Sequence, residues 1–356
     1  MLTINAEGGE VKLSDRKEKI LACVVAGYIA SGEPIGSKSI CEELSVSSAT
    51  VRNEMSELCE LGYLEKRHTS SGRIPSAKGY RYYVDNLITP NPLSDEECIR
   101  IENEITKDAT SPEQVIKNAS NVLAELTGCA TVFTTPEDKN AQIQKVELIP
   151  ASKRTAILVL LTSSGILKNC VCRIDIEIDE NLKDSFKDIV DKYFIGSSVT
   201  EMTPELLERI IESLGSENYA ITPLLSALYS LSKDASQSKT VVESQTNLLA
   251  YRNETDNMLE LLDFLRSREQ SSQLVAYQST SKSDMLSILI GSENYFSEMS
   301  NSSMILARYA FGNREVGTLG IIGPTRIDYS KLIPNVKYLT ELVGRVITDK
   351  FEDNET

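Results

Sequence analysis

The chain has 356 residues, 41% of them hydrophobic, and a net charge of −15 at pH 7. This length and composition are typical of a soluble protein with two or three domains. No apolar run approaches the roughly 20 residues that span a bilayer, and the first residues lack the basic and apolar regions of a signal peptide. We therefore expect a cytoplasmic protein with no membrane partner.

The negative charge is unevenly distributed. Residues 1–88 carry 11 basic and 12 acidic side chains, whereas the remaining residues carry 26 and 40. Local charge, rather than the total, decides whether a protein binds nucleic acid. The acidic later part of the chain should therefore face away from any nucleic acid that the first part binds.

Residues 1–13 are polar and predict a flexible leader, and residues 14–88 predict one domain. Asp15 and Glu18 have the spacing of a helix start. Ser37 is a candidate cap for a short second helix. The inward residues expected for these two helices are Leu21, Val24, Val25, Tyr28, Ile40 and Leu44.

A third helix follows Ser47, which can serve as its N-cap. Its apolar residues Val51, Met55 and Leu58 recur at helical spacing and predict one buried stripe. The opposite face carries short polar, methyl and arginine side chains, which suit the major groove: Asn pairs with adenine, Arg with guanine, and Ala contacts the thymine methyl group. The candidate DNA-binding residues here are Ser47, Ser48, Ala49, Thr50, Arg52, Asn53 and Ser56.

Gly62 ends this helix, and two short strands joined near Gly72 predict a wing. Between Lys66 and Arg81 the chain has six basic or histidine side chains and no acidic one. Phosphate contacts need such a local excess; the simpler alternative is a solvated basic loop beside a chance helical pair. We predict a DNA-binding winged helix. The remaining candidate DNA-binding residues are Ser37, Lys38, Lys66, Arg67, His68, Ser71, Gly72, Arg73, Lys78 and Arg81.

Residues 89–93 form a proline-containing linker, after which helices and strands alternate in blocks. Helices are predicted at 94–108, 112–127, within 180–269 and at 333–349, and strands at 130–134, 142–149, 155–161, 166–174, 285–290, 304–310 and 316–322. Strands on both sides of a helical block indicate one α+β domain, 94–180 and 253–350, interrupted by a helical insertion, 181–252. Strand 166–174 would then pair with strands beyond Met285. The apolar stripes at 206–211 and 224–231 predict that the insertion forms a dimer.

Two segments resemble a known family. GYLEKRHTSSGRIPSAKGYRYYVD and, downstream, VGTLGIIGPTRIDYSKLIPNVKYLTELV are similar to the HrcA family of bacterial heat-shock repressors, and the resemblance runs from about Leu13 to about Ile347. It implies a winged helix, with its reading helix at 47–61 and its wing at 66–74, joined to a GAF-like domain that carries an inserted dimerising segment. It also implies an inverted-repeat operator called CIRCE, ahead of the dnaK and groE operons, and a repressor that the GroE chaperonin keeps active until heat stress diverts the chaperonin.

Other function classes have weaker support. The sequence has no cluster of acids, nucleophiles or metal ligands that predicts an enzyme, so we expect no catalytic activity, metal or cofactor. The Gly-rich stretch 312–329 is either a small-molecule pocket or a set of structural turns. Seven cysteines are present; Cys170 and Cys172 share one face of a strand, and two thiolates make a poor zinc site. A ligand- or redox-sensing winged-helix regulator remains the alternative.

Overall fold

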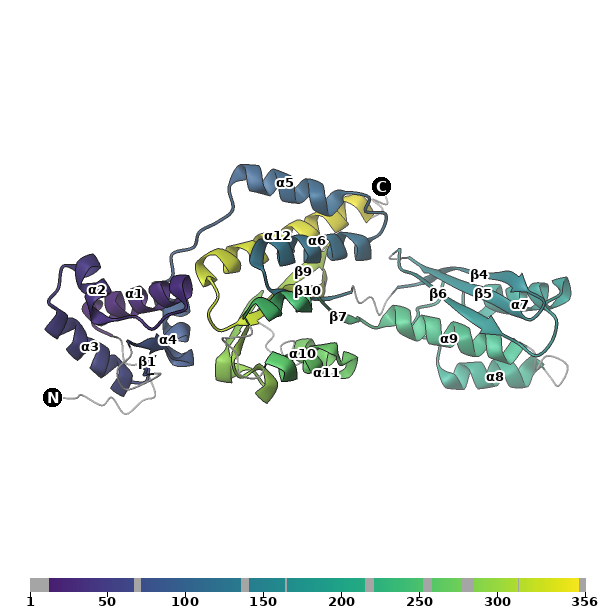
Figure 1. Ribbon diagram of the computed structural model, residues 1–356. Helices are drawn as coiled ribbons and strands as arrows, with labels where there is room; N and C mark the ends of the chain where they lie inside the picture. Colours follow the sequence, from purple (N-terminus) through teal and green to yellow (C-terminus); the bar gives the residue numbers. More distant parts are fainter. Residues whose placement is uncertain are drawn as a thin grey trace, which may run out of the picture.

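A computed structural model describes residues 13–66, 72–135, 141–163, 165–214, 221–251, 258–276, 285–312 and 314–351. Three parts follow one another along the molecule (Figure 1): a winged helix at one end, a central domain, and a smaller α+β unit at the other end. None of the helices in these ranges has the length and apolar composition to span a membrane.

The helices and strands of the winged helix follow the predicted order. It consists of α1 (Asp15–Ser31), α2 (Ser37–Leu44), α3 (Ser48–Glu60), β1 (Leu64–Glu65), β2 (Ile74–Pro75), α4 (Ala77–Tyr82) and the π-helical turn η1 (Tyr83–Leu87). Leu21, Val24 and Val25 are buried as predicted, and Tyr28 is half-buried. The N-cap of α2 is Gly36, and Ser37 is the first residue of the helix.

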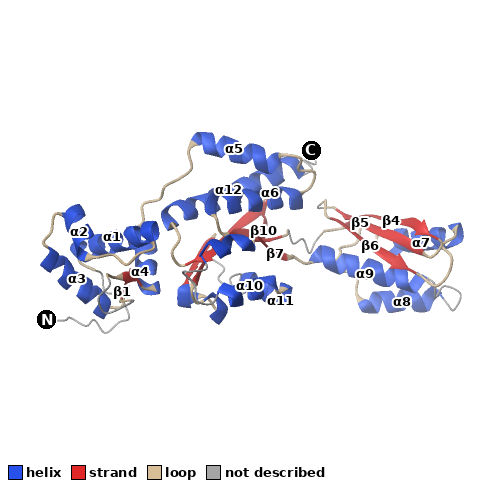
Figure 2. Ribbon diagram, viewed as in Figure 1, coloured by secondary structure: helices blue, strands red, loops and turns tan. Residues whose placement is uncertain are grey.

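The central domain is a five-stranded antiparallel sheet in the order β7-β3-β10-β9-β8. Its strands are β3 (Ala130–Thr134), β7 (Thr240–Glu243), β8 (Leu286–Ile290), β9 (Ser302–Phe311) and β10 (Arg314–Pro324). Helices cover both faces (Figure 2): α5 (Asp95–Thr106), α6 (Pro112–Thr127) and α12 (Tyr329–Phe351) on one, and α10 (Met258–Arg266) and α11 (Arg268–Ala276) on the other.

The central sheet contributes side chains to two hydrophobic cores, because successive side chains of a strand point to opposite faces of the sheet. On β9, Ile305 and Tyr309 join the core formed with α6 and α12, whereas Met304 and Leu306 join the core formed with α10 and α11. The first of these cores continues into the winged helix through Tyr80 and neighbouring residues.

The third unit has its own sheet and its own core. Strands β4 (Ile143–Ser152), β5 (Thr155–Thr162) and β6 (Leu167–Arg173) form an antiparallel sheet beside α7 (Glu180–Tyr193), α8 (Pro204–Leu214) and α9 (Thr222–Ser236). Leu158 and Leu160 of β5 pack in the same cluster as Phe186 of α7 and Leu228 of α9. The strands and the helices therefore form one unit.

This arrangement corrects three predictions. Strand 166–174 does not pair with strands beyond Met285, since β6 pairs with β5. The insertion is α+β rather than helical, so the predicted boundary between 180 and 181 falls inside one core. Residues 240–243, predicted within the helical insertion, form β7 and pair with β3. Strand-forming residues look alike in both sheets, and periodicity alone does not say which sheet a strand joins.

The predicted fold class is confirmed: an α+β multidomain chain with an N-terminal winged helix and an α+β domain interrupted by an insertion. The helical stripes at 206–211 and 224–231, however, do not form an exposed surface. Their main apolar residues are buried against one another and against the sheet: Leu207, Ile210, Leu224, Leu225, Leu228 and Leu231. The expected dimer contact through those stripes assumed that they are exposed, and that assumption is therefore wrong.

Candidate nucleic-acid interface

Helix α3 packs against the winged-helix core in the predicted orientation. Val51 and Leu58 are fully buried and Met55 is 3% exposed. At the start of the helix the Ser47 hydroxyl accepts a hydrogen bond from the Thr50 backbone N–H at 3.2 Å, which confirms Ser47 as the N-cap. The buried stripe fixes the rotation of α3 about its axis, so its other face is turned outward.

The outward face carries the predicted reading residues. Ala49, Arg52, Asn53 and Ser56 are exposed, and Thr50 is half-buried. These side chains have the donors, acceptors and methyl group that read base edges in the major groove. The solvent-facing side of α3 is thus a candidate base-reading surface.

Hydrogen bonds connect the starts of α2 and α3 beside this surface. The Ser37 and Ser48 hydroxyls lie 3.2 Å apart, and the Nε of Arg52 donates to the Ser37 hydroxyl at 3.3 Å. The contact orients the Arg52 side chain along the α2 side of the reading face. Both helix starts also present backbone N–H groups and a positive dipole end, which favour phosphate oxygens. Lys38 is exposed at the same place.

Helix α1 pairs with acidic residues of the reading helix. Lys17 Nζ lies 3.0 Å from a Glu54 carboxylate oxygen and 2.8 Å from one of Glu57. Hydrogen bonds to Glu57 and Glu54 raise the pKa of Lys17, so this lysine is fully charged at neutral pH. Sequence inspection missed this pairing, which reduces the repulsion between α3 and a DNA phosphate chain.

The wing is attached to the segment before α2. Ile35 and Arg73 exchange backbone hydrogen bonds of 2.9 Å in both directions, next to the β1–β2 pair. A Cβ on Gly72 would lie 2.4 Å from the Ile35 carbonyl oxygen. Only glycine allows this approach, so Gly72 serves a packing role at the base of the wing. The predicted turn at 71–72 extends into residues outside the described ranges.

The other predicted DNA contacts differ from one another in exposure and in their hydrogen-bond partners. Lys66 is exposed at the end of β1, and Arg73 is half-buried at the start of β2. Lys78 is exposed and donates to the Leu61 carbonyl at 3.0 Å, at the C-terminal end of α3. Arg67, His68 and Ser71 lie outside the described residues.

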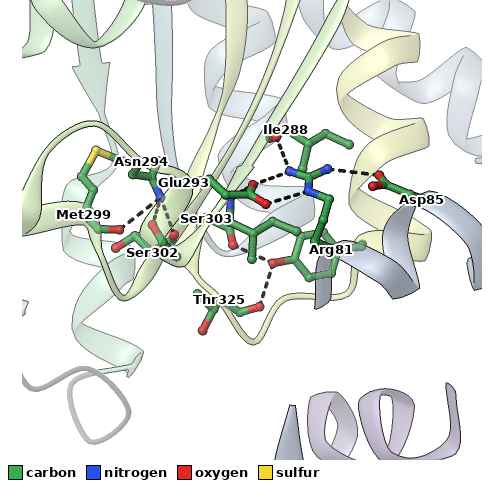
Figure 3. Close-up of polar contacts among 12 residues, drawn as sticks. Arg81, Asp85, Ile288, Glu293, Asn294, Met299, Ser302, Ser303 and Thr325 are labelled. Atoms are coloured by element: carbon green, nitrogen blue, oxygen red, sulfur yellow. Dashed lines mark hydrogen bonds and ion pairs between the residues drawn. The ribbon is translucent and has the colours of Figure 1, made fainter. Parts of the chain in front are cut away.

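Arg81, predicted as a DNA contact, has protein partners in the structure. Its guanidinium donates to the Glu293 carboxylate at 2.8 Å, to the Ile288 carbonyl at 2.6 Å and to Asp85 at 3.1 Å (Figure 3). These partners occupy the guanidinium on the side facing the central domain. The sequence shows the positive charge but not a carboxylate partner 212 residues away in the chain.

Two observations on the described residues bear on the ligand- and redox-sensing alternatives. A Cβ on Gly320 would lie 2.1 Å from the Ile305 carbonyl oxygen, so this glycine of the 312–329 stretch permits close strand packing. Burial raises the pKa of Cys172 and of Cys129 to about 12 each. Both thiols are protonated at neutral pH and are poor nucleophiles.

A winged helix with an outward polar recognition face, followed by an acidic α+β domain, defines a DNA-binding transcription regulator. Family comparison agrees. Residues 12–85 match the winged helix-turn-helix transcription repressor HrcA DNA-binding model, and residues 113–333 match the HrcA protein C terminal domain model. The chain belongs to the HrcA family of heat-inducible transcription repressors.

Individual relatives cover nearly the whole chain. The heat-inducible transcription repressor HrcA of Clostridium botulinum (strain Eklund 17B / Type B) is 33% identical over 344 residues, covering 95% of this chain and 99% of the relative. That of Acetivibrio thermocellus is 33% identical over 331 residues, covering 92% and 94%. A solved structure described as a hypothetical protein is 25% identical, with a TM-score of 0.64 over 95% of this chain and 99% of that one.

Proposed function

We propose that this protein acts in the cytoplasm as a homodimer that binds an inverted-repeat operator of the CIRCE type and represses chaperone operons. The GroE chaperonin keeps it active, and heat stress removes that activity. The exposed polar face of α3 is the observation that carries the DNA-binding part of the proposal. A palindrome offers two half-sites, which call for two winged helices related by a two-fold axis.

An exposed apolar surface of the third unit supports the dimer. One face of the β4–β5–β6 sheet packs on α7 and α9, while the opposite face is open. We call this the open sheet face; it carries Ile149, Ile157, Val159, Leu161, Leu167 and Val171. Val171 is 71% exposed and Leu167 is 53% exposed. Exposed apolar side chains grouped on one face, with polar residues among them, mark protein-binding surfaces.

The register of the strands sorts the apolar residues of this face into two rows, separated by a row in which Val159 lies between Glu147 and Asn169. Ile149 pairs with Ile157, and Ile157 pairs with Val171, so three apolar residues form one row across the sheet. Leu161 and Leu167 are paired in a second row. The face lies in the unit farthest from the winged helix (Figure 1), and a second copy bound there leaves α3 uncovered.

The wing predicts a specific salt response. Replacing Lys66 with alanine should weaken binding to every duplex and reduce the slope of log affinity against log salt by about one, because one phosphate contact is lost. Fluorescence anisotropy at several salt concentrations measures both quantities. Lys153→Ala is the control, since Lys153 is exposed in the third unit. An unchanged slope and affinity for Lys66→Ala would show that Lys66 does not contact DNA.

The topology supports dependence on a chaperonin. Strand β3 pairs with β10 on one side and with β7 on the other. The whole third unit lies between β3 and β7 in the sequence. Sheets built from such distant strands fold slowly and leave strand edges and apolar faces uncovered meanwhile. A chaperonin captures chains in that state. Heat adds competing unfolded clients, so fewer repressor molecules reach the active form.

This part of the proposal predicts a chaperonin-dependent active fraction. Unfolded protein is diluted into buffer with or without GroE chaperonin and ATP, and operator-competent molecules are counted by titration with labelled DNA. The fraction should be higher with chaperonin, and the difference should increase on heating. Equal fractions at every temperature would exclude the chaperonin and favour the ligand- or redox-sensing alternative.

A further inference from the structure

An ion pair connects the winged helix to the central domain. Arg81 lies on α4, and Glu293 ends the short 3₁₀ turn η5 (Gly291–Glu293) that follows β8. Two guanidinium nitrogens of Arg81, Nε and Nη2, donate to the two carboxylate oxygens of Glu293, and Nη2 also donates to the Ile288 carbonyl (Figure 3). Such two-pronged contacts fix orientation as well as distance.

The Glu293 side of the contact is itself held in place. Its carboxylate accepts a hydrogen bond from the Ile290 backbone N–H at 2.8 Å. The next residue, Asn294, is buried and donates to the carbonyls of Gly291, Met299 and Ser302 at 2.8–3.1 Å (Figure 3). These bonds tie the turn to the start of β9, so Glu293 sits on a rigid support.

A second contact lies elsewhere on the winged helix. Arg326, which follows β10, donates to the Ile29 carbonyl at 2.6 Å, near the C-terminal end of α1. The linker is attached too, since the Asn91 N–H donates to the Ser330 carbonyl at 2.8 Å. Three separate attachments restrict rotation of one domain against the other, whereas a linker alone would allow it.

Apolar contacts fill the space around these attachments. The rings of Tyr80 and Tyr329 lie 5.8 Å apart between centroids, and both residues are buried. The Ala77 Cβ lies 3.0 Å from the position that a Cβ on Gly291 would occupy. Helix α3 lies away from this junction (Figure 1), and its residues Ala49, Arg52, Asn53 and Ser56 are exposed. The junction therefore orients the winged helix without covering its DNA-binding face.

We infer that Arg81 and Glu293 are positioning residues for operator binding, which hold the two winged helices of the dimer at the separation that the two half-sites require. The inference rests on the proposed binding of an inverted repeat by a dimer. Neither residue contacts DNA. Their effect comes through effective concentration: after one winged helix binds, a rigid junction keeps the other near its half-site.

Glu293→Ala in the full-length protein is the decisive variant, because Glu293 lies in the central domain and away from α3. Affinity for the inverted repeat should fall about tenfold or more, while affinity for a single half-site stays unchanged. The variant should also tolerate a wider range of spacer lengths. Adding one or two base pairs to the spacer should reduce the affinity of the variant less than it reduces that of wild type. A purely structural loss of stability would not change this spacer preference.

Asp85→Ala is the matched control, because it removes a partner of the same arginine within the winged helix and leaves the contact to Glu293 intact. It should behave as wild type. Arg81→Lys keeps the charge but loses the two-pronged contact, and it repeats the test if Glu293→Ala does not fold.

The outcomes separate the two proposals. If wild type binds the inverted repeat no better than a half-site, the proposed dimeric operator binding fails and this inference fails with it. Wild type is expected to bind the inverted repeat more tightly than a half-site. If Glu293→Ala and Arg81→Lys both keep this difference in affinity and the same spacer preference, only the positioning role is overturned.

Discussion

Replacing Arg52 with alanine should weaken binding to the specific operator by about 1–3 kcal/mol and relax the preference at one base pair. Arg52 is exposed on the reading face of α3, and its contact with the Ser37 hydroxyl orients the guanidinium. An arginine in the major groove donates two hydrogen bonds to a guanine, which other bases do not accept in the same way. Anisotropy titrations against operators carrying each base at each position measure both effects.

The matched control is Arg209→Ala, since Arg209 is an exposed helical arginine of the third unit. It should leave the affinity unchanged. Equal losses for Arg52→Ala on the operator and on an unrelated duplex would identify a phosphate contact rather than a base contact. No loss on either duplex would show that α3 is not the reading helix.

Replacing Val171 with glutamate should convert the dimer to a monomer and lower the affinity for the inverted repeat by about 10²–10⁴-fold. Val171 is the most exposed residue of the open sheet face, so the substitution leaves the core of the third unit intact. In a two-fold interface the new carboxylate occurs on both copies and is buried from water without a partner, which is unfavourable. Light scattering measures the mass in solution.

Leu259→Glu provides the control, because Leu259 is 75% exposed on α10 and lies outside the open sheet face. It should remain a dimer with full affinity. Half-site affinity should be the same for both variants, since neither changes the winged helix. A dimer that persists in Val171→Glu, with unchanged operator affinity, would place the interface elsewhere.

The winged helix could be predicted from the sequence because its signals are local. Helical spacing of Val51, Met55 and Leu58 fixes which side of α3 is buried, and the hydroxyl of Ser47 caps the helix within three residues. The reading face follows by exclusion from the buried stripe. These contacts need no knowledge of the rest of the chain.

Features that depend on distant partners could not be predicted in this way. Arg81 has the charge of a phosphate contact, but Glu293 and the Ile288 carbonyl determine its role. The strands within 143–173 contain strand-forming residues, as do those of the central sheet, and only their pairing reveals a separate unit with an open sheet face. Gly72 looks like a turn residue, and its contact with Ile35 appears only in three dimensions.

A titration of the full-length protein with three DNA duplexes tests the central claim most directly. The duplexes are a CIRCE-type inverted repeat, the same duplex with one half scrambled, and one with both halves scrambled, at several salt concentrations. Two chains should bind the intact repeat, with an affinity higher by orders of magnitude than for the fully scrambled duplex, and the half-scrambled duplex should lie between. Equal affinity for all three duplexes at every salt concentration would contradict sequence-specific, dimeric operator binding.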